Sequence, residues 1–531
     1  MTLRSTRRRF LAATAAGLAA PSIAGAAADR LLRFVPHADL TVVDPGWTTA
    51  YITRNHALLV YDTLWGTDAG LNPQYQMLAG HRVEDDGKTW ILTLRDGLRF
   101  HDGEPVRAQD VAASIRRWGQ RDSFGQTVLL VTDALEPVDD KTLRIRLKRP
   151  FPLLAHALGK AGSSVCAILP ERLATSDRAR PITEVIGSGP YRYKPLERVP
   201  GARVVYERNP DYVPRPDGAA SFTAGPKIAH FDRVEWHILA EAATAGAALQ
   251  SGEVDWWEAP SADLLPLLRR NKALEVKVHD KTGILGFMRM NHDIPPFNNP
   301  AIRRAVLGAI SQEDFMSAVA GSDPANWHTP IGFFAPDSPV ASEVGLDVFR
   351  GKRDYDRVKR EIAAAGYKGE KVVVMVPSDN TVLKAAGEVG ADCLSRAGFN
   401  VDAQYLEWGA LVQRLARFDG TGQNSWNIYH SYWSGLDQAN PAVNASLRAN
   451  GKALGRPGMA ESPTLEAMRD QWLAATSPED HKRIAREIQL QAFQDLPYIP
   501  VGQAFMPMAY RGNVKGVLDG FPLFWNVRKD G

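Results

Sequence analysis

The tripeptide Gly87-Lys88-Thr89 could do chemistry, because nucleotide-binding proteins hold phosphate with a glycine-rich loop that ends in this way. Such a loop needs a glycine five residues earlier, where this chain has Arg82. Residues 90–94 (WILTL) then favour a strand, whereas a phosphate loop opens a helix. We therefore interpret 83–106, which contains three Asp-Gly pairs, as a meander of short antiparallel strands with tight reversals.

Catalytic side chains at a recognisable spacing are scarce in this chain. It has no Gly-x-Ser-x-Gly and no His-Glu-x-x-His, and no two of its 12 histidines lie three or four residues apart. The most tempting acid–base pair is His101-Asp102, but adjacent residues in an Asp-Gly turn usually face apart. No local spacing supports a metal site, and we expect neither a catalytic residue nor a cofactor.

A better candidate for a binding site is the stretch 426–437 (WNIYHSYWSGLD), where a short strand runs into a loop. Loops that leave the strands of an open α/β sheet are where ligands bind. Tyr432 and Trp433 offer aromatic faces, and Asp437 offers a carboxylate for a cation. The alternative is that Trp433 belongs to the core and Asp437 is a solvated loop residue, and the residues alone leave both open. The remaining candidates that we select for this site are Asp379, Trp408, Trp47 and Tyr51.

The first 28 residues predict an export signal of the twin-arginine type. Residues 6–11 (TRRRFL) place adjacent arginines before an apolar pair, and a mild alanine-rich run follows to a small-residue cleavage site. The alternative is a surface helix with a basic end. The apolar run falls short of the ~20 residues that span a membrane. We expect a cleaved, soluble mature chain in the periplasm that begins near residues 27–29.

Length and composition narrow the class of protein. A chain of 531 residues exceeds what one core normally serves, so two or more lobes are expected. The formal charge is only +3, which implies no nucleic-acid partner. The only cysteines, Cys166 and Cys393, are too few for a disulfide framework. We expect both to be buried, unpaired thiols.

Periodicity divides the chain into a β-rich first part and an α/β second part. Strands are predicted at 31–35, 141–147, 203–207 and 234–239, and helices are predicted near 58–60 and at 108–118. Residues 284–500 alternate strands such as 371–376 with helices at 301–319, 353–365, 381–397, 463–475 and 479–495, so they form a separate lobe. The last residues, from 500, are strand-like again, and we expect them to return to the first lobe.

Five ordered motifs resemble the family 5 extracellular solute-binding proteins, the peptide- and nickel-binding components of ABC importers. They are 78–117 (LAGHRVEDDGKTWILTLRDGLRFHDGEPVRAQDVAASIRR), 187–191 (GSGPY), 207–212 (ERNPDY), 291–310 (NHDIPPFNNPAIRRAVLGAI) and 496–501 (LPYIPV). They span nearly the whole mature chain.

The resemblance implies an α/β, bilobal periplasmic-binding-protein fold, with two mixed-sheet lobes joined by a hinge. The chain would cross between the lobes twice. The first lobe would comprise 29–60, 181–280 and 500–531, with an extra β-rich subdomain at 61–180, and the second lobe 281–499. The protein would be a monomer that is not an enzyme, and it would deliver a small-molecule or peptide ligand to an inner-membrane ABC permease.

The candidate site departs from the family's pattern at two places. Peptide binders of the family place an aspartate just after the tryptophan that corresponds to Trp433, where it pairs with the ligand's ammonium group; here Leu436 intervenes before Asp437. Dipeptide binders also carry an arginine for the ligand's carboxylate where this chain has Ser378-Asp379. Asp379 cannot pair with the ligand's carboxylate, because two ionised carboxylates repel each other. A longer peptide held by its backbone, or a ligand that is cationic at one or both ends, therefore fits the residues better.

The leading hypothesis is a periplasmic receptor for a peptide-like or cationic organic solute. The alternative from another class is a secreted bilobal hydrolase or metalloenzyme, which requires a convergent nucleophile–base pair or three metal ligands. A binding protein reused as a chemosensory or chaperone component would share every motif and would differ only in its partner.

Overall fold

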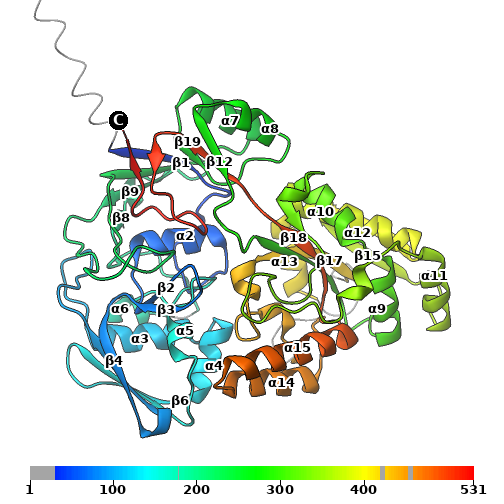
Figure 1. Ribbon diagram of the computed structural model, residues 1–531, viewed down its shortest axis with the longest axis horizontal. Helices are drawn as coiled ribbons and strands as arrows, with labels where there is room; N and C mark the ends of the chain where they lie inside the picture. The colour runs from blue at the N-terminus through cyan, green and yellow to red at the C-terminus, as the bar shows by residue number, and fades with distance from the viewer. Residues whose placement is uncertain (1–29, 178, 419–424, 452–457, 531) are drawn as a thin grey trace, which may run out of the picture.

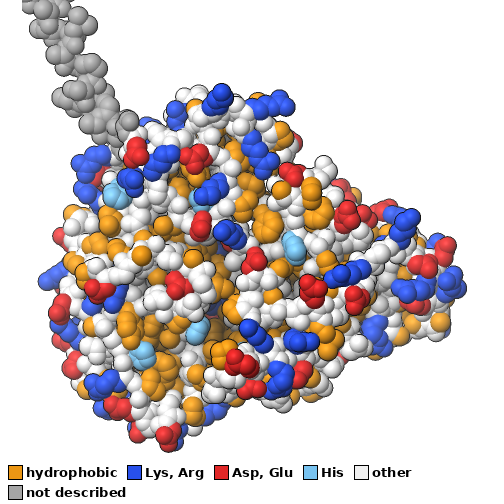
Figure 2. Space-filling model, viewed as in Figure 1, with side chains coloured by type: hydrophobic (Ala, Val, Ile, Leu, Met, Phe, Trp, Pro, Cys, Tyr) orange, Lys and Arg blue, Asp and Glu red, His pale blue; other side chains and the backbone are white. Residues whose placement is uncertain are grey.

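The computed structural model describes residues 30–177, 179–418, 425–451 and 458–530. The export signal predicted at residues 1–28 lies outside these ranges. Two bodies lie side by side in Figure 1, and connecting segments near the middle of the molecule join them. Within the described ranges, every helix is too short or too polar to cross a membrane. Figure 2 shows acidic and basic side chains intermixed over the face in view.

A seven-stranded mixed sheet forms the first lobe. Its strands, in spatial order, are β12 (Leu274–Lys277), β19 (Met508–Arg511), β11 (Trp256–Trp257), β1 (Leu31–Val35), β10 (Arg233–His237), β9 (Arg203–Arg208) and β8 (Tyr191–Tyr193). The central β1 is parallel to β10 and β11, whereas the outer pairs are antiparallel. Phe34 on β1 packs against Trp236, Trp256 and Phe524, so aromatic side chains dominate this core.

Three helices and two small hairpins complete the first lobe. They are α2 (Tyr51–Val60), α7 (Ala242–Ser251), α8 (Leu265–Arg270), the pair β2 (Trp65–Thr67) and β3 (Pro73–Tyr75), and the pair β20 (Val514–Lys515) and β21 (Arg528–Lys529). Every residue of α2 from 52 to 60 is buried, although four consecutive members are polar. This helix lies at the side of the first lobe that faces the second (Figure 1).

A four-stranded antiparallel sheet lies within residues 61–180, the range that was predicted to form a β-rich subdomain. Its order is β4 (Leu78–Glu84), β5 (Thr89–Leu94), β7 (Thr142–Leu147) and β6 (Thr132–Pro137). The helices α3 (Ala108–Trp118), α4 (Ser123–Val131), α5 (Leu154–Leu158) and α6 (Glu171–Ala174) accompany it. Gly87 has a φ of +88° in the β4–β5 reversal and Thr89 begins a strand, so the interpretation of this stretch as a turn is confirmed.

A six-stranded mixed sheet forms the second lobe. Its order is β14 (Trp327–His328), β18 (Ile499–Ala504), β13 (Ile284–Met290), β17 (Ile428–Ser434), β15 (Lys371–Pro377) and β16 (Asn400–Leu406). The helices around it are α9 (Pro300–Val306), α10 (Gln312–Ala320), α11 (Tyr355–Ala364), α12 (Thr381–Arg396), α13 (Trp408–Ala416), α14 (Pro463–Ala474) and α15 (Pro478–Asp495). Strand β15 is parallel to β16 and β17, and β13 is antiparallel to β17 and β18.

One predicted helix is two helices. The periodicity at 301–319 suggested a single element, but the chain leaves the helix after Val306, and Ile310 is extended at φ −84° and ψ 119°. The Ser311 hydroxyl then accepts a hydrogen bond from the N–H of Asp314 and caps α10. The serine cap starts a new helix in the middle of an apolar pattern.

The chain crosses between the two sheets twice, at residues 278–283 and 505–507. The expected boundary at residue 500 is wrong by a few residues, because β18 pairs with β13 and β14 in the second lobe. The return to the first lobe comes after Ala504. The crossings lie close together: a Cβ on Gly283 would stand 2.5 Å from the carbonyl oxygen of Ala504.

Candidate ligand-binding site

The loop that follows β17 places Asp437 where the two lobes meet. A short 3₁₀ helix, Gly435–Gln438, begins at Ser434, whose hydroxyl accepts a hydrogen bond from the N–H of Leu436. This turn directs Asp437 away from the strand and buries it, with 5% of its surface exposed. The expected strand followed by a loop is therefore confirmed, and Asp437 is not a solvated loop residue.

Tyr51, the first residue of α2, connects the lobes through its hydroxyl. The hydroxyl donates to Oδ2 of Asp437 at 3.1 Å and accepts from the N–H of Ser434 at 2.5 Å. Burial and the nearby Asp437 carboxylate raise the pKa of Tyr51 well above its usual value, so the phenol stays neutral. Two residues selected from the sequence, 386 positions apart, thus meet across the lobe interface.

The subdomain encloses Asp437 from a third direction. A Cβ built on Gly162 would lie 2.2 Å from Oδ1 of Asp437, so the backbone of the 159–165 loop lies directly against the carboxylate. Burial raises the pKa of Asp437 from 3.8 to about 6, and the nearby cations Lys160 and Arg54 limit this rise. The side-chain hydrogen bond recorded for this carboxylate comes from a neutral hydroxyl. A buried carboxylate with so little compensation is suited to bind a cation.

The polar residues of α2 extend the site into the first lobe. Arg54 donates from Nε and Nη2 to Oδ1 of Asn55, at 3.2 and 3.1 Å. Asn55 in turn donates to Oε1 of Glu258 at 3.1 Å, and Oε2 of Glu258 accepts from the N–H of His37 at 2.8 Å and contacts its Nδ1 at 2.7 Å. Burial acts to raise the pKa of Glu258, but the His37 contacts outweigh it and lower the pKa overall.

Tyr432 is a half-buried residue of β17. Burial raises its pKa; a hydrogen bond with Asn380 opposes this shift, and the charge of Glu258 in the first lobe adds to it. Asp379, in contrast, is exposed, and its Oδ1 accepts the N–H of Trp408 at 2.8 Å. Trp408 is half-buried against the small apolar cluster around Leu411. The structure thus gives Asp379 a local role at the start of α13 and does not bring it into the Tyr51–Asp437 contact.

The two remaining tryptophan candidates are half-buried. Trp433 donates from Nε1 to the hydroxyl of Ser446 at 2.8 Å and packs against the core of the second lobe. Trp47 stacks on Arg121, whose guanidinium carbon lies 4.0 Å from the ring centroid. Trp433 therefore has a structural role in addition to any stacking face that it offers a ligand.

Other residues singled out in the sequence serve the fold. His101 Nε2 contacts the carbonyl oxygen of Gly189 at 3.1 Å, and burial lowers the pKa of this histidine to about 4. Cys166 and Cys393 are both buried and free, as expected. In the part of the chain that the structure describes, no three His, Cys, Asp or Glu side chains gather closely enough to hold a metal ion.

Sequence reasoning missed Arg54, Asn55 and Glu258. Residues 53–56 (TRNH) place four polar side chains in an otherwise apolar helix, and because the structure buries them they need hydrogen-bond partners. Their partner Glu258 lies 203 residues from Asn55, so no local pattern could have linked them.

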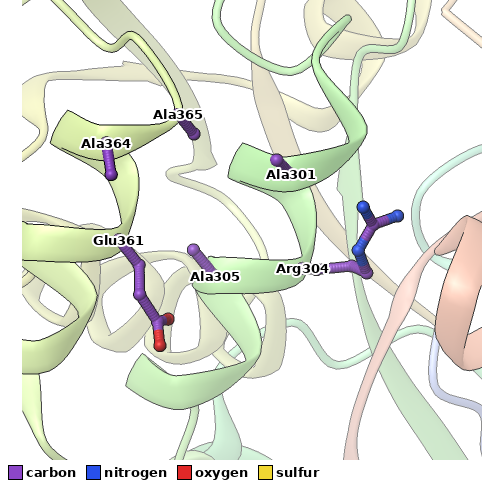
Figure 3. A pocket seen from close by; sticks show the side chains of 6 residues that line it. All are labelled: Ala301, Arg304, Ala305, Glu361, Ala364 and Ala365. Atoms are coloured by element: carbon purple, nitrogen blue, oxygen red, sulfur yellow. The ribbon is translucent and has the colours of Figure 1, made fainter.

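A surface hollow between α9 and α11 offers no comparable chemistry (Figure 3). It is lined by Ala301, Arg304, Ala305, Glu361, Ala364 and Ala365. Arg304 donates to the carbonyl oxygen of Gln494, and Glu361 pairs with Arg357. Its walls are short alanine side chains, and both of its charges have partners elsewhere.

Comparison with known proteins agrees with this geometry. The family model for "Bacterial extracellular solute-binding proteins, family 5 Middle" matches residues 72–453. A probable peptide ABC transporter periplasmic-binding protein, y4tO, from Sinorhizobium fredii (strain NBRC 101917 / NGR234) is 36% identical over 537 residues, 99% of each chain.

Solved structures share the fold. The dipeptide binding protein from Pseudoalteromonas sp. SM9913, in complex with Met-Leu, superposes with a TM-score of 0.78 at 20% identity over 94% of this chain and 100% of that chain. The PBP AgaA from A. tumefaciens R10, in complex with agropinic acid, gives 0.79 at 18% identity over 94% and 99%. The chain therefore belongs to family 5 of the bacterial extracellular solute-binding proteins and has their bilobal fold.

Proposed function

We propose that this protein is the periplasmic solute-binding component of an ABC importer, and that it captures a peptide-like solute with a free ammonium group. The observation that carries the proposal is the buried Asp437 carboxylate, which lies between the lobes with the neutral Tyr51 hydroxyl as its hydrogen-bond donor. An ammonium group at this position would form a charge-assisted hydrogen bond, which contributes roughly 1.5–3 kcal/mol when shielded from water.

Two further findings support a peptide-like solute. The relative with 36% identity over the whole chain is named as a peptide ABC transporter protein. The charge of Glu258 in the first lobe also acts on Tyr432 and adds to the rise of its pKa. Aromatic faces and carboxylates together recognise cationic organic groups.

The partner and the compartment follow from the same proposal. A binding component delivers its solute to an inner-membrane permease, so we expect the protein to be exported by its twin-arginine signal, to act as a monomer and to catalyse nothing. The expected ligand changes in one respect. Asp379 accepts a hydrogen bond from the N–H of Trp408, so the proposal that the ligand carries a cation rests on Asp437 and no longer on Asp379.

The test uses a synthetic library of di- to tetrapeptides and its N-acetylated twin. The purified protein is first freed of bound solute by mild denaturation and refolding. It is then incubated with each library and desalted, and the retained peptides are counted by mass spectrometry. We expect retention from the free library and at least tenfold less from the acetylated one. Equal retention from both, or none from either, would refute the proposal.

A further inference from the structure

Arg54 is a buried cation whose hydrogen-bonding capacity is only partly used. Its exposed fraction is 6%, because every residue of α2 from Ile52 onward is buried. A guanidinium group carries five N–H donors and remains charged in proteins. Burial acts against that charge and lowers the pKa of Arg54. Burying such a group without partners for its donors is costly.

The guanidinium group is held in one orientation. Asn55 accepts hydrogen bonds from Nε and Nη2 on one edge of the group. The guanidinium carbon lies 3.5 Å from the centroid of the Phe521 ring. Tyr51 contributes a second ring at 4.7 Å. These rings hold the face of the guanidinium group and Asn55 holds one of its edges, so the position of Nη1 is also fixed.

Nη1 has no hydrogen-bond partner among the residues that the structure describes. Three carboxylates, those of Asp437, Asp280 and Glu258, act on Arg54 electrostatically. None forms an ion pair with it in the described part of the chain, and each has donors elsewhere. Asp437 accepts from Tyr51, Asp280 from Thr282, and Glu258 from His37 and Asn55.

Arg54 lies beside the contact that carries the proposed ammonium site. It follows Tyr51 by three residues on the same helix, and side chains at this spacing are neighbours on one face. Tyr51 is the residue that reaches Asp437 across the interface. The unused donor and the buried carboxylate are therefore parts of the same site.

We propose that Arg54 binds a carboxylate of the solute, so that the preferred ligand is zwitterionic. This inference rests on the proposed function, since it assigns the second charge of the same solute. Arg54 lies on α2 of the first lobe and Asp437 lies in the second lobe after β17, so the two charges would contact the solute from opposite lobes. A zwitterion also adds no net charge to a site that already holds three carboxylates.

The test compares the free-acid peptide library with its C-terminal amide twin, which keeps the ammonium group but has no carboxylate. We expect wild-type protein to retain the acids at least tenfold better, which corresponds to about 1.4 kcal/mol. Arg54→Met should lose this preference. Arg54→Lys should keep part of it, because it preserves the charge but not the planar fork. Arg82→Met, at an exposed arginine paired with Glu84, is the matched control and should behave as wild type.

The outcomes separate the two proposals. Equal retention of acids and amides by wild-type protein, with the acetylated library still excluded, would overturn the role of Arg54 and leave the ammonium site intact. Failure to retain any library would overturn both. A preference for acids that persists in a folded Arg54→Met variant would also refute the inference. If that variant does not fold, the wild-type comparison and Arg54→Lys still decide.

Discussion

At the scale of single residues, the burial of the Asp437 carboxylate lowers the stability of the folded protein at neutral pH. Its folded-state pKa of about 6 lies above its ordinary 3.8, so the folded protein holds this proton more tightly than the unfolded chain does. The contribution of Asp437 to the free energy of unfolding is therefore greatest below about pH 4 and falls as the pH rises through 6. Above that pH the buried charge is a cost that a bound cation would offset.

This sign gives a prediction for the ligand-free protein. Asp437→Asn removes the buried charge and keeps the shape of the side chain. At pH 7.5 the free energy of unfolding of this variant should therefore equal that of wild-type protein or exceed it by up to roughly 1–3 kcal/mol, so that it melts at the same or a higher temperature. The advantage should vanish near pH 4.5. Thermal melts across this range measure it. A variant that melts well below wild type at pH 7.5 would show that Asp437 supports the fold.

Site residues could be predicted only where the functional side chains are close together in the sequence. The stretch 426–437 places an aromatic strand before a carboxylate, so Asp437 and Tyr432 could be selected from sequence. Asp379 was selected because it stands where dipeptide binders of the family carry an arginine, but its carboxylate accepts a hydrogen bond from the backbone N–H of Trp408, which no sequence pattern predicts. The network in which Arg54 binds Asn55 depends on the hydrogen bond from Asn55 to Glu258, which joins positions 203 residues apart.

At the scale of elements, the backbone of the 159–165 loop lies directly against Asp437. We expect Gly162→Ala to prevent this approach, because the new Cβ would lie 2.2 Å from Oδ1. The backbone of Gly162 is not in the left-handed region, so the substitution strains contacts and not the chain. Peptide retention should fall at least tenfold. Small-angle scattering of the ligand-free variant should show a larger radius of gyration.

Gly409→Ala is the matched control, since a Cβ there meets no atom within 4 Å. Unchanged retention in the Gly162 variant, with the same radius of gyration as the control, would contradict the described closure.

Most predicted element limits agree with the structure to within two residues, and the exceptions concern one divided helix and the sheet that one strand joins. Strand 31–35 and helix 108–118 match their predicted bounds because local pattern and burial agree there. The predicted helix 301–319 failed because Ser311 caps a second helix inside one apolar pattern. Residues 500–504 were assigned to the wrong lobe, since the sequence indicates that a strand exists but not which sheet it joins.

At the scale of the whole molecule, two lobes joined by two crossings enclose the site. The lobes also touch away from it, where Arg469 of α14 donates to the hydroxyl of Thr127 on α4 at 3.5 Å. Such contacts must separate when the lobes open to admit a solute. Capture by closure therefore exchanges contacts between the lobes for contacts with the ligand.

The protein must be exported before it can bind a periplasmic solute, and we propose that its export depends on the signal at residues 1–28. Replacing Arg7, Arg8 and Arg9 together with lysine should leave precursor in the cytoplasm, because the route's receptor recognises adjacent guanidinium groups. Cell fractionation and immunoblotting measure this. Replacing Arg4 alone with lysine is the control and should leave export intact. Normal periplasmic accumulation of the triple variant would refute the assignment.

The most direct test of the central claim is the solute that copurifies with the protein from the periplasm, measured by mass spectrometry after denaturation. We predict a peptide-like solute with a cationic group from wild-type protein and less than a tenth of that amount from Asp437→Asn. Trp118→Ala, in the core of the subdomain, should lower stability by roughly 3–5 kcal/mol and keep the solute. Equal amounts from wild type and Asp437→Asn, or a purely anionic solute, would contradict the account.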